Sequence, residues 1–199
     1  KFDDSYAYLP SVRRIRRLSA TQKDDALAGT DYAIQDFREF NDRLVAWDFK
    51  ILAKHKPMLA VLHSGHTDEF SKTRKPLPLY PGTAFPVMKW EVHPDTWVIE
   101  ATPKDKERIY AKKIIVLDGY TWAPLHTGVY DRQGKLWKSI QNVWTKQIKD
   151  YGVIEITFYA YDHQANHASF NNLDFSVCTF NYGYSPDYFS IKHLQTISR

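Results

Sequence analysis

The sequence lacks the features of a disulfide-stabilised protein, a membrane span or a familiar catalytic site. Its 199 residues contain a single cysteine, Cys178, so no internal disulfide can form. It has no apolar run of about 18 residues or more, the length of a membrane-spanning helix. It also has no G-x-S-x-G, Walker, G-x-G-x-x-G or H-E-x-x-H motif. We therefore expect a protein that is not an enzyme, holds no cofactor or metal and does not span a membrane.

The charge of the chain is only mildly basic, with a formal net charge of +4 and a pI of about 9.0. This balance permits contact with anionic lipid without requiring it, and we expect no nucleic-acid partner. The chain starts at Lys1 and reaches a strand-like run at residues 6–9 with no secretion signal before it. We expect one domain over residues 1–199 that lacks an N-terminal portion of the intact protein.

The aromatic content is high, at 15%, which favours β-sheet because aromatic side chains pack well on a pleated surface. Residues 45–52 alternate between apolar and polar, as in a half-buried strand, and the apolar run at 58–62 is expected to pair with them. Short turns separate further strand-like segments at 97–101, 108–117, 122–130, 135–144, 153–161 and 175–179. Pro124 indicates a sheet edge or a bulge. Connections this short make neighbouring strands antiparallel.

Two helices and one long loop complete the expected architecture. Thr30 or Asp31 can cap a short helix over residues 32–40, with Ile34, Phe37 and Phe40 on its buried side. A terminal helix is predicted to start at residues 185–187, where a serine precedes a proline. Residues 63–86 contain several prolines and are predicted to form a long loop.

An enzyme hypothesis would rest on Asp162, His163 and His167. The two histidines are four residues apart, a spacing that suits metal ligation on a helix. They follow a predicted strand and lie among asparagine and glutamine residues, which is the composition of a loop, and no third ligand is nearby. We interpret them, like His63 and His66, as ordinary loop histidines.

The most concentrated charge is a run of four arginines near the N-terminus: Arg13, Arg14, Arg16 and Arg17. They could bind phosphate or carboxylate groups, or form a solvated face balanced by nearby aspartates. Apolar residues recur at every third position of this run, so neither face of a strand would be free of arginine. We predict that at least one arginine is partly buried and paired with Asp31, and that breaking this pair destabilises the fold.

Short motifs along the chain resemble those of one bacterial family. Residues 8–17 read YLPSVRRIRR, close to YLP-x-x-RR-x-RR, and residues 29–32 read GTDY, close to G-[ST]-D. The hairpin at residues 97–113 is similar to VVEAT…R-x-Y-x-[KR]. The turn at 118–122 resembles DEDSW with two departures, and residues 130–137 read YDRQGKLW, close to YD-x-x-G-x-LW. These motifs resemble the outer-membrane lipoprotein-sorting-like (LolA/LolB-like) superfamily, in a large periplasmic branch with no assigned activity.

This resemblance covers about residues 6–144 and implies a fold, a location and a function. The implied fold is mainly β (α+β): a strongly curved antiparallel sheet, a half-barrel, with a few helices packed on or in its concave face. The implied location is the periplasm of a bacterial envelope. By analogy with the superfamily, the concave face would hold a lipid, an acyl chain or a lipoprotein. An envelope transporter or another subunit would then be a partner.

Aromatic and apolar residues on alternating strand faces are the predicted ligand lining: Trp47, Phe49, Trp97, Ile99, Trp137 and Phe158. The alternative is that these residues fill a closed core, and that the chain is a non-catalytic structural or interaction subunit of an envelope complex. A continuous apolar pocket of some hundreds of Å³ would favour ligand binding, and a filled interior would favour the structural role.

Overall fold

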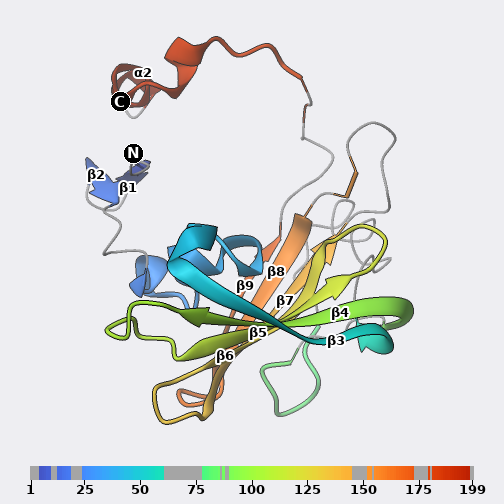
Figure 1. The fold of residues 1–199 in the computed structure, drawn as a ribbon. Helices are drawn as coiled ribbons and strands as arrows, with labels where there is room; N and C mark the ends of the chain where they lie inside the picture. The colour runs from blue at the N-terminus through green and yellow to red at the C-terminus, as the bar shows by residue number, and fades with distance from the viewer. Residues whose placement is uncertain are drawn as a thin grey trace.

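A single antiparallel sheet of seven strands dominates the fold in the computed structural model of the chain (Figure 1). The structure describes residues 5–9, 13–18, 24–60, 78–85, 87, 90–144, 152–153, 155–172, 179 and 181–197. The strands follow one another in chain order from one edge of the sheet to the other. They are β3 (Trp47–Ala60), β4 (Glu91–Pro103), β5 (Lys112–Asp118), β6 (Pro124–Tyr130), β7 (Leu136–Trp144), β8 (Glu155–Asp162) and β9 (His167–Asn172).

This meander confirms the predicted fold class, because the sheet is curved, antiparallel and unclosed, with β3 and β9 at its edges. Ile51 lies opposite Ile99 and Ile99 opposite Ile115, so alternate apolar residues of β3, β4 and β5 share one face. We call this the inner face, and the opposite side the outer face. Pro124 opens β6 beside a shift in register, so of the two predicted possibilities, a sheet edge or a bulge, the structure has the bulge.

In the described part of the chain, three short 3-10 helices precede the sheet: η2 (Leu27–Gly29), η3 (Ile34–Glu39) and η4 (Leu44–Ala46). Residues of η3 and η4 pack on the inner face. The helix predicted over residues 32–40 is present only as η3, and Arg38, with a φ of 50°, breaks it. Its buried residues are Gln35, Asp36 and Glu39, whereas the apolar residues predicted to be buried are half-buried. The polar residues of η3 are buried in place of the apolar ones because they have polar partners on the sheet.

Strands β3 and β9 differ most from the sequence prediction. β3 continues to Ala60, so residues 58–60 belong to β3 and pair with β4 rather than with residues 45–52. β9 begins at His167, where a loop was predicted, because its polar sequence has no apolar alternation to reveal a strand. Cys178, His63, His66 and most of the strand predicted at 175–179 lie outside the described residues.

The core has a layer on each face of the sheet. On the outer face, Leu125 and Trp144 belong to one buried cluster. On the inner face, one cluster gathers around Trp47 and a second around Tyr32, whose ring stacks on that of Phe158 at a centroid distance of 3.9 Å. Because Tyr32 comes from the segment before the sheet, the second cluster fixes that segment against the strands.

The two ends of the described chain lie near each other and away from the sheet (Figure 1), and Tyr6 lines a hollow together with residues of the segment 188–197. β1 (Ser5–Leu9) and β2 (Arg14–Leu18) form a separate two-stranded hairpin. The chain ends in η6 (Pro186–Phe189) and α2 (Ile191–Ile197), where the terminal helix was predicted. Among the described helices, none has the length and apolar character needed to cross a membrane.

Candidate functional site

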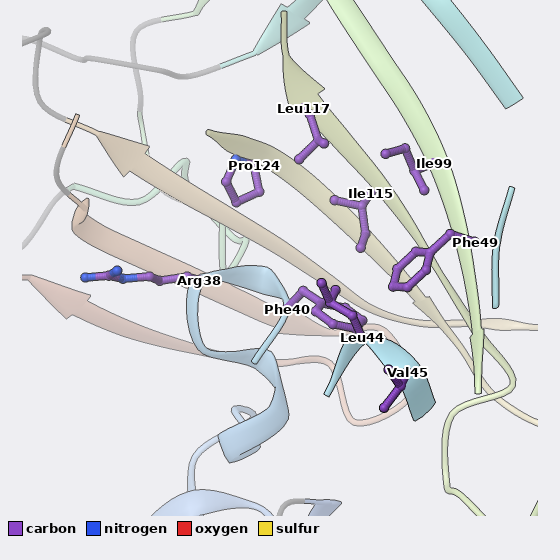
Figure 2. Close-up of a pocket in the computed structure, with 9 residues that line it drawn as sticks. All are labelled: Arg38, Phe40, Leu44, Val45, Phe49, Ile99, Ile115, Leu117 and Pro124. Atoms are coloured by element: carbon purple, nitrogen blue, oxygen red, sulfur yellow. The ribbon is translucent and has the colours of Figure 1, made fainter. Parts of the chain in front are cut away.

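An open, apolar cavity of about 610 Å³ lies between the inner face of the sheet and the segment 38–45 (Figure 2). All but one of its lining side chains are apolar: Arg38, Phe40, Leu44, Val45, Phe49, Ile99, Ile115, Leu117 and Pro124. The volume falls within the range of about 300–1,000 Å³ that is typical of ligand sites. We refer to it as the apolar cavity.

The apolar cavity has a wall of strand residues and a roof of residues from the helical segment. The strands present inward-facing side chains such as Ile99 and Ile115, while Phe40, Leu44 and Val45 come from the segment around η4 (Figure 2). The Phe40 ring meets those of Trp47 and Phe49 edge to face, at centroid distances of 5.3 and 5.5 Å. These contacts attach the roof to β3.

The apolar residues around the opening are more exposed than a closed core would leave them. Leu44 is 67% exposed, Val45 68% and Phe49 46%. Single exposed apolar residues are ordinary, but a group of them beside an apolar hollow is typical of a surface that meets a ligand or a partner. Covering such surface is favourable by about 25 cal/mol per Å².

Arg38 is the charged residue of the lining, and it separates the apolar cavity from a second hollow of about 500 Å³. Its guanidinium points away from the apolar side chains (Figure 2) and lies 3.7 Å from the Glu155 carboxylate. Burial raises the pKa of Glu155 to about 7, an effect that Arg38 partly offsets. Arg38 and Phe40 line both hollows, and Phe158 lines only the second.

A buried ion pair anchors η3 to β5 below the roof. The Lys113 ammonium, which has no exposure to solvent, donates to Asp36 Oδ1 at 2.8 Å. It also donates to the backbone oxygens of Gln35 and Glu39, at 3.1 and 3.2 Å. The other oxygen of Asp36 accepts from the Tyr110 hydroxyl at 2.8 Å. These partners explain why polar residues rather than apolar ones face the sheet from η3.

Glu39 is fully buried beside this ion pair, between η3 and β6. The Thr127 hydroxyl donates to Glu39 Oε2 at 2.5 Å. Burial raises the pKa of Glu39 to about 8, although the hydrogen bond from Thr127 opposes this shift. The side chain is therefore mostly a neutral acid at pH 7, and it lies next to the residues that form the roof.

Arg108 holds the segment before the sheet to the turn between β4 and β5. Its guanidinium makes two hydrogen bonds to the Asp24 carboxylate, at 2.8 and 2.6 Å, and one to Asp42 Oδ2 at 2.9 Å. It also donates to Gln35 Oε1 at 2.9 Å. Trp47 Nε1 donates to the same Asp42 oxygen. Because Asp42 lies between Phe40 and Leu44 in the chain, this network positions the roof.

The structure places the six predicted lining residues in three different surroundings. Phe49 and Ile99 line the apolar cavity, and Trp47, which is 3% exposed, packs against the lining residues Phe40 and Ile115. Phe158 and Trp137 pack against the cluster around Tyr32. Trp97 contacts the ring of Trp122 at a centroid distance of 5.5 Å, outside the cavity lining. A ligand role for any of these residues stays a prediction.

The arginine segment lies on the β1–β2 hairpin, where the side chains of Arg13, Arg14 and Arg17 are exposed. Asp31 instead meets β9: its Oδ2 accepts from the Ser169 hydroxyl at 2.8 Å and lies 2.7 Å from His167 Nδ1. The side chain of Arg16 lies outside the described residues. Pairing of an arginine with Asp31 stays a prediction, as does anion binding by the run.

The residues of the enzyme hypothesis have structural partners. Asp162 accepts a hydrogen bond from Trp137 Nε1 at 2.8 Å, His163 Nε2 lies 2.8 Å from the Ser139 hydroxyl, and His167 meets Asp31. Over the part of the chain that the structure describes, no group of three or more His, Cys, Asp or Glu residues is arranged to hold a metal.

Sequence reasoning missed several residues of the site. Leu44 and Val45 were not recognised as a roof, because Val45 was assigned to a strand and Leu44 lay outside any predicted element. Ile115 and Leu117 are in a strand that was predicted, and their alternation with Lys113 would have placed all three on one face. A lysine on the same strand face as buried apolar residues indicates a buried ammonium group. Such a group needs an acidic partner from another part of the chain.

Comparisons with known proteins identify the family. The model of a family described as a protein of unknown function, DUF1329, matches residues 1–195. A domain from Vibrio parahaemolyticus named for outer membrane lipoprotein sorting has a similar fold, with a TM-score of 0.66 and 23% identity over 98% of this chain and 67% of that one. A DUF1329 family protein from Desulfovibrio piger gives a TM-score of 0.59 and 18% identity over 98% and 66%.

This chain therefore spans about two thirds of the length of each of these two structures. A search of curated proteins gives no significant match. The fold that the resemblance of the motifs implied is confirmed, because the Vibrio domain named for outer membrane lipoprotein sorting has a similar fold. With the family model matching nearly the whole sequence, the chain belongs to the DUF1329 family.

Proposed function

We propose that this chain binds or carries a hydrophobic ligand in the bacterial envelope, and that the ligand is an acyl chain of a lipid or lipoprotein held in the apolar cavity. The single observation that carries this proposal is the cavity itself: about 610 Å³, open to solvent and lined by apolar side chains with one exception. Each methylene group buried there contributes about 0.8 kcal/mol.

The same observation favours binding over the alternative of a purely structural subunit. A structural subunit would need a filled interior, whereas here Leu44, Val45 and Phe49 leave apolar surface exposed beside an open hollow. The charged residue of the lining, Arg38, leaves room for an acyl chain, because its guanidinium points away from the apolar side chains (Figure 2). Binding rather than catalysis is therefore the function we propose.

The proposed setting is the periplasm, with an envelope transporter or another subunit as the partner that gives or receives the ligand. The name of the Vibrio domain links that protein to lipoprotein sorting at the outer membrane, and its similar fold supports the same setting here. Likeness of fold alone is weak support for function, so the cavity remains the main argument.

The direct experiment is to purify the protein without detergent, extract it with organic solvent and identify the extracted lipids by mass spectrometry. The stripped protein is then mixed with radiolabelled palmitate. We expect a lipid to copurify, or palmitate to bind in a saturable way. A protein that neither carries an amphiphile nor binds palmitate would overturn the proposal.

Two similarly exposed side chains of β3 provide a matched pair of variants. Phe49 and Leu52 are exposed to nearly the same extent, 46% and 45%, but only Phe49 lines the apolar cavity. We expect Phe49→Ser to weaken palmitate binding about tenfold or more, because a large apolar contact is lost. Leu52→Ser should bind as the parent does. Equal affinities for both variants would contradict the proposed location of the ligand.

A further inference from the structure

The outer face of the sheet carries a hollow of about 360 Å³, which we call the outer hollow; it is separate from the apolar cavity and has a different chemistry. Its floor is a row of side chains on three adjacent strands: His126 on β6 lies opposite Gln141 on β7, which lies opposite Tyr159 on β8. Tyr80, Phe85 and Trp90 form its aromatic wall.

The aromatic wall is held in place by hydrogen bonds. The Tyr159 hydroxyl donates to the backbone oxygen of Ala84 at 3.1 Å, which attaches residues 80–85 to the sheet. Within that turn, the backbone N–H of Tyr80 donates to the oxygen of Phe85 at 3.0 Å. The wall residues nevertheless stay open to solvent, with Tyr80 47%, Phe85 42% and Trp90 45% exposed. The hollow is therefore preformed and presents aromatic surface to a ligand.

The polar groups of the hollow are uncharged and have free hydrogen-bonding capacity. His126 Nδ1 is buried and has no hydrogen-bond partner among the described residues. Burial also lowers the pKa of this histidine, which favours its neutral form. The half-buried Gln141 amide makes no side-chain hydrogen bond with any described residue, and the Ser139 hydroxyl lies 2.8 Å from His163. Lone buried polar atoms are rare in folded proteins and are typically satisfied by water or a ligand.

We propose that this outer hollow is a binding site for a neutral saccharide. A pyranose ring has one face of C–H groups, which packs on aromatic rings, and a rim of hydroxyls, which binds to amide, hydroxyl and imidazole groups. An acyl chain would leave Gln141 and His126 unpaired, which is unfavourable. An anionic or cationic ligand would find no side chain of opposite charge in the lining. The uncharged polar floor and the aromatic wall together therefore select a sugar.

The test uses two probes, maltotriose and N,N′-diacetylchitobiose, and saturation-transfer-difference NMR of their ring protons in the presence of the full chain. We expect saturation transfer to at least one sugar. Trp90→Ala should abolish this transfer, and Gln141→Ala should weaken binding about tenfold, because the sugar loses a hydrogen-bond partner.

Trp122→Ala is the matched control, since Trp122 is a similarly exposed tryptophan, at 56%, that packs on Trp97 rather than in the outer hollow. It should bind the sugar as the parent does. Phe49→Ser, which alters the apolar cavity, should also leave sugar binding unchanged. Absence of transfer to both sugars at millimolar concentration, or transfer that persists in both Trp90→Ala and Gln141→Ala, would overturn the proposal.

Discussion

At the scale of single residues, Lys113 anchors η3 to the sheet. Its ammonium is fully buried and satisfied by Asp36 and two backbone oxygens of η3. We expect Lys113→Met to lower the free energy of unfolding by about 3–5 kcal/mol, because the change leaves the Asp36 carboxylate buried without its cation. Urea denaturation followed by circular dichroism measures this loss.

The adjacent lysine provides the control. Lys112 forms an ion pair with Glu100 at 3.0 Å, but both side chains are partly exposed. Lys112→Met should therefore cost less than about 1 kcal/mol. If the two variants lost equal stability, the buried pair would not be the anchor that the structure indicates.

Glu39 should make the stability of the protein depend on pH. Burial raises its pKa to about 8, so the folded state holds a proton that the unfolded chain releases at acidic pH. The stability from this group is fully present at low pH, below the ordinary carboxyl range, and is lost as the pH rises through about 8. We expect the parent to be less stable at pH 9 than at pH 7.5, and Glu39→Gln to be nearly insensitive over this window.

Glu155, whose pKa is raised to about 7, adds a similar loss of stability at lower pH, so the window from 7.5 to 9 isolates Glu39. Chemical denaturation at each pH gives the comparison. Parallel pH profiles for the parent and Glu39→Gln would show that Glu39 is ionised in the folded protein at pH 7.5.

At the scale of elements, Arg108 connects the segment before the sheet to the β4–β5 turn. We expect Arg108→Gln to lower the free energy of unfolding by about 2–3 kcal/mol, because its charge-assisted hydrogen bonds to Asp24 and Asp42 are lost. Palmitate affinity should also fall, since Asp42 lies within the roof segment. Lys106→Gln, which removes an exposed cation from the same turn, is the control and should change neither quantity. Retained stability and affinity in Arg108→Gln would contradict a positioning role.

The elements also show where sequence patterns are informative. Strands β4 to β8 were predicted because apolar alternation and short turns recur there, and Pro124 indicated a sheet edge or a bulge. The helix predicted over residues 32–40 was given the wrong buried face. Its polar residues Asp36 and Glu39 are buried because they bind Lys113 and Thr127, and the local periodicity gives no sign of these distant partners. Tertiary partners of this kind override local apolar patterns.

At the scale of the whole molecule, the curved sheet with helical turns on its inner face was predictable, because the motifs resemble those of one superfamily. The lining of the apolar cavity was predictable only in part. Phe49 and Ile99 were predicted as lining and do line it, whereas Trp97 and Trp137 lie elsewhere. Alternation gives the face of a strand on which a residue lies. It does not reveal which part of that face the segment before the sheet covers. The cavity could therefore not be located from the strands alone, because Leu44 and Val45 of that segment form its roof.

Photo-crosslinking with a diazirine-bearing palmitate, followed by mass spectrometry of the labelled peptides, shows directly whether the acyl chain lies in the apolar cavity. We expect labels within residues 40–49, 99 and 115–117, and loss of these labels when excess unlabelled palmitate is present. Labels concentrated on the outer hollow, at residues 80–90 or 159, or labelling that unlabelled palmitate does not reduce, would contradict the claim that the apolar cavity binds the acyl chain.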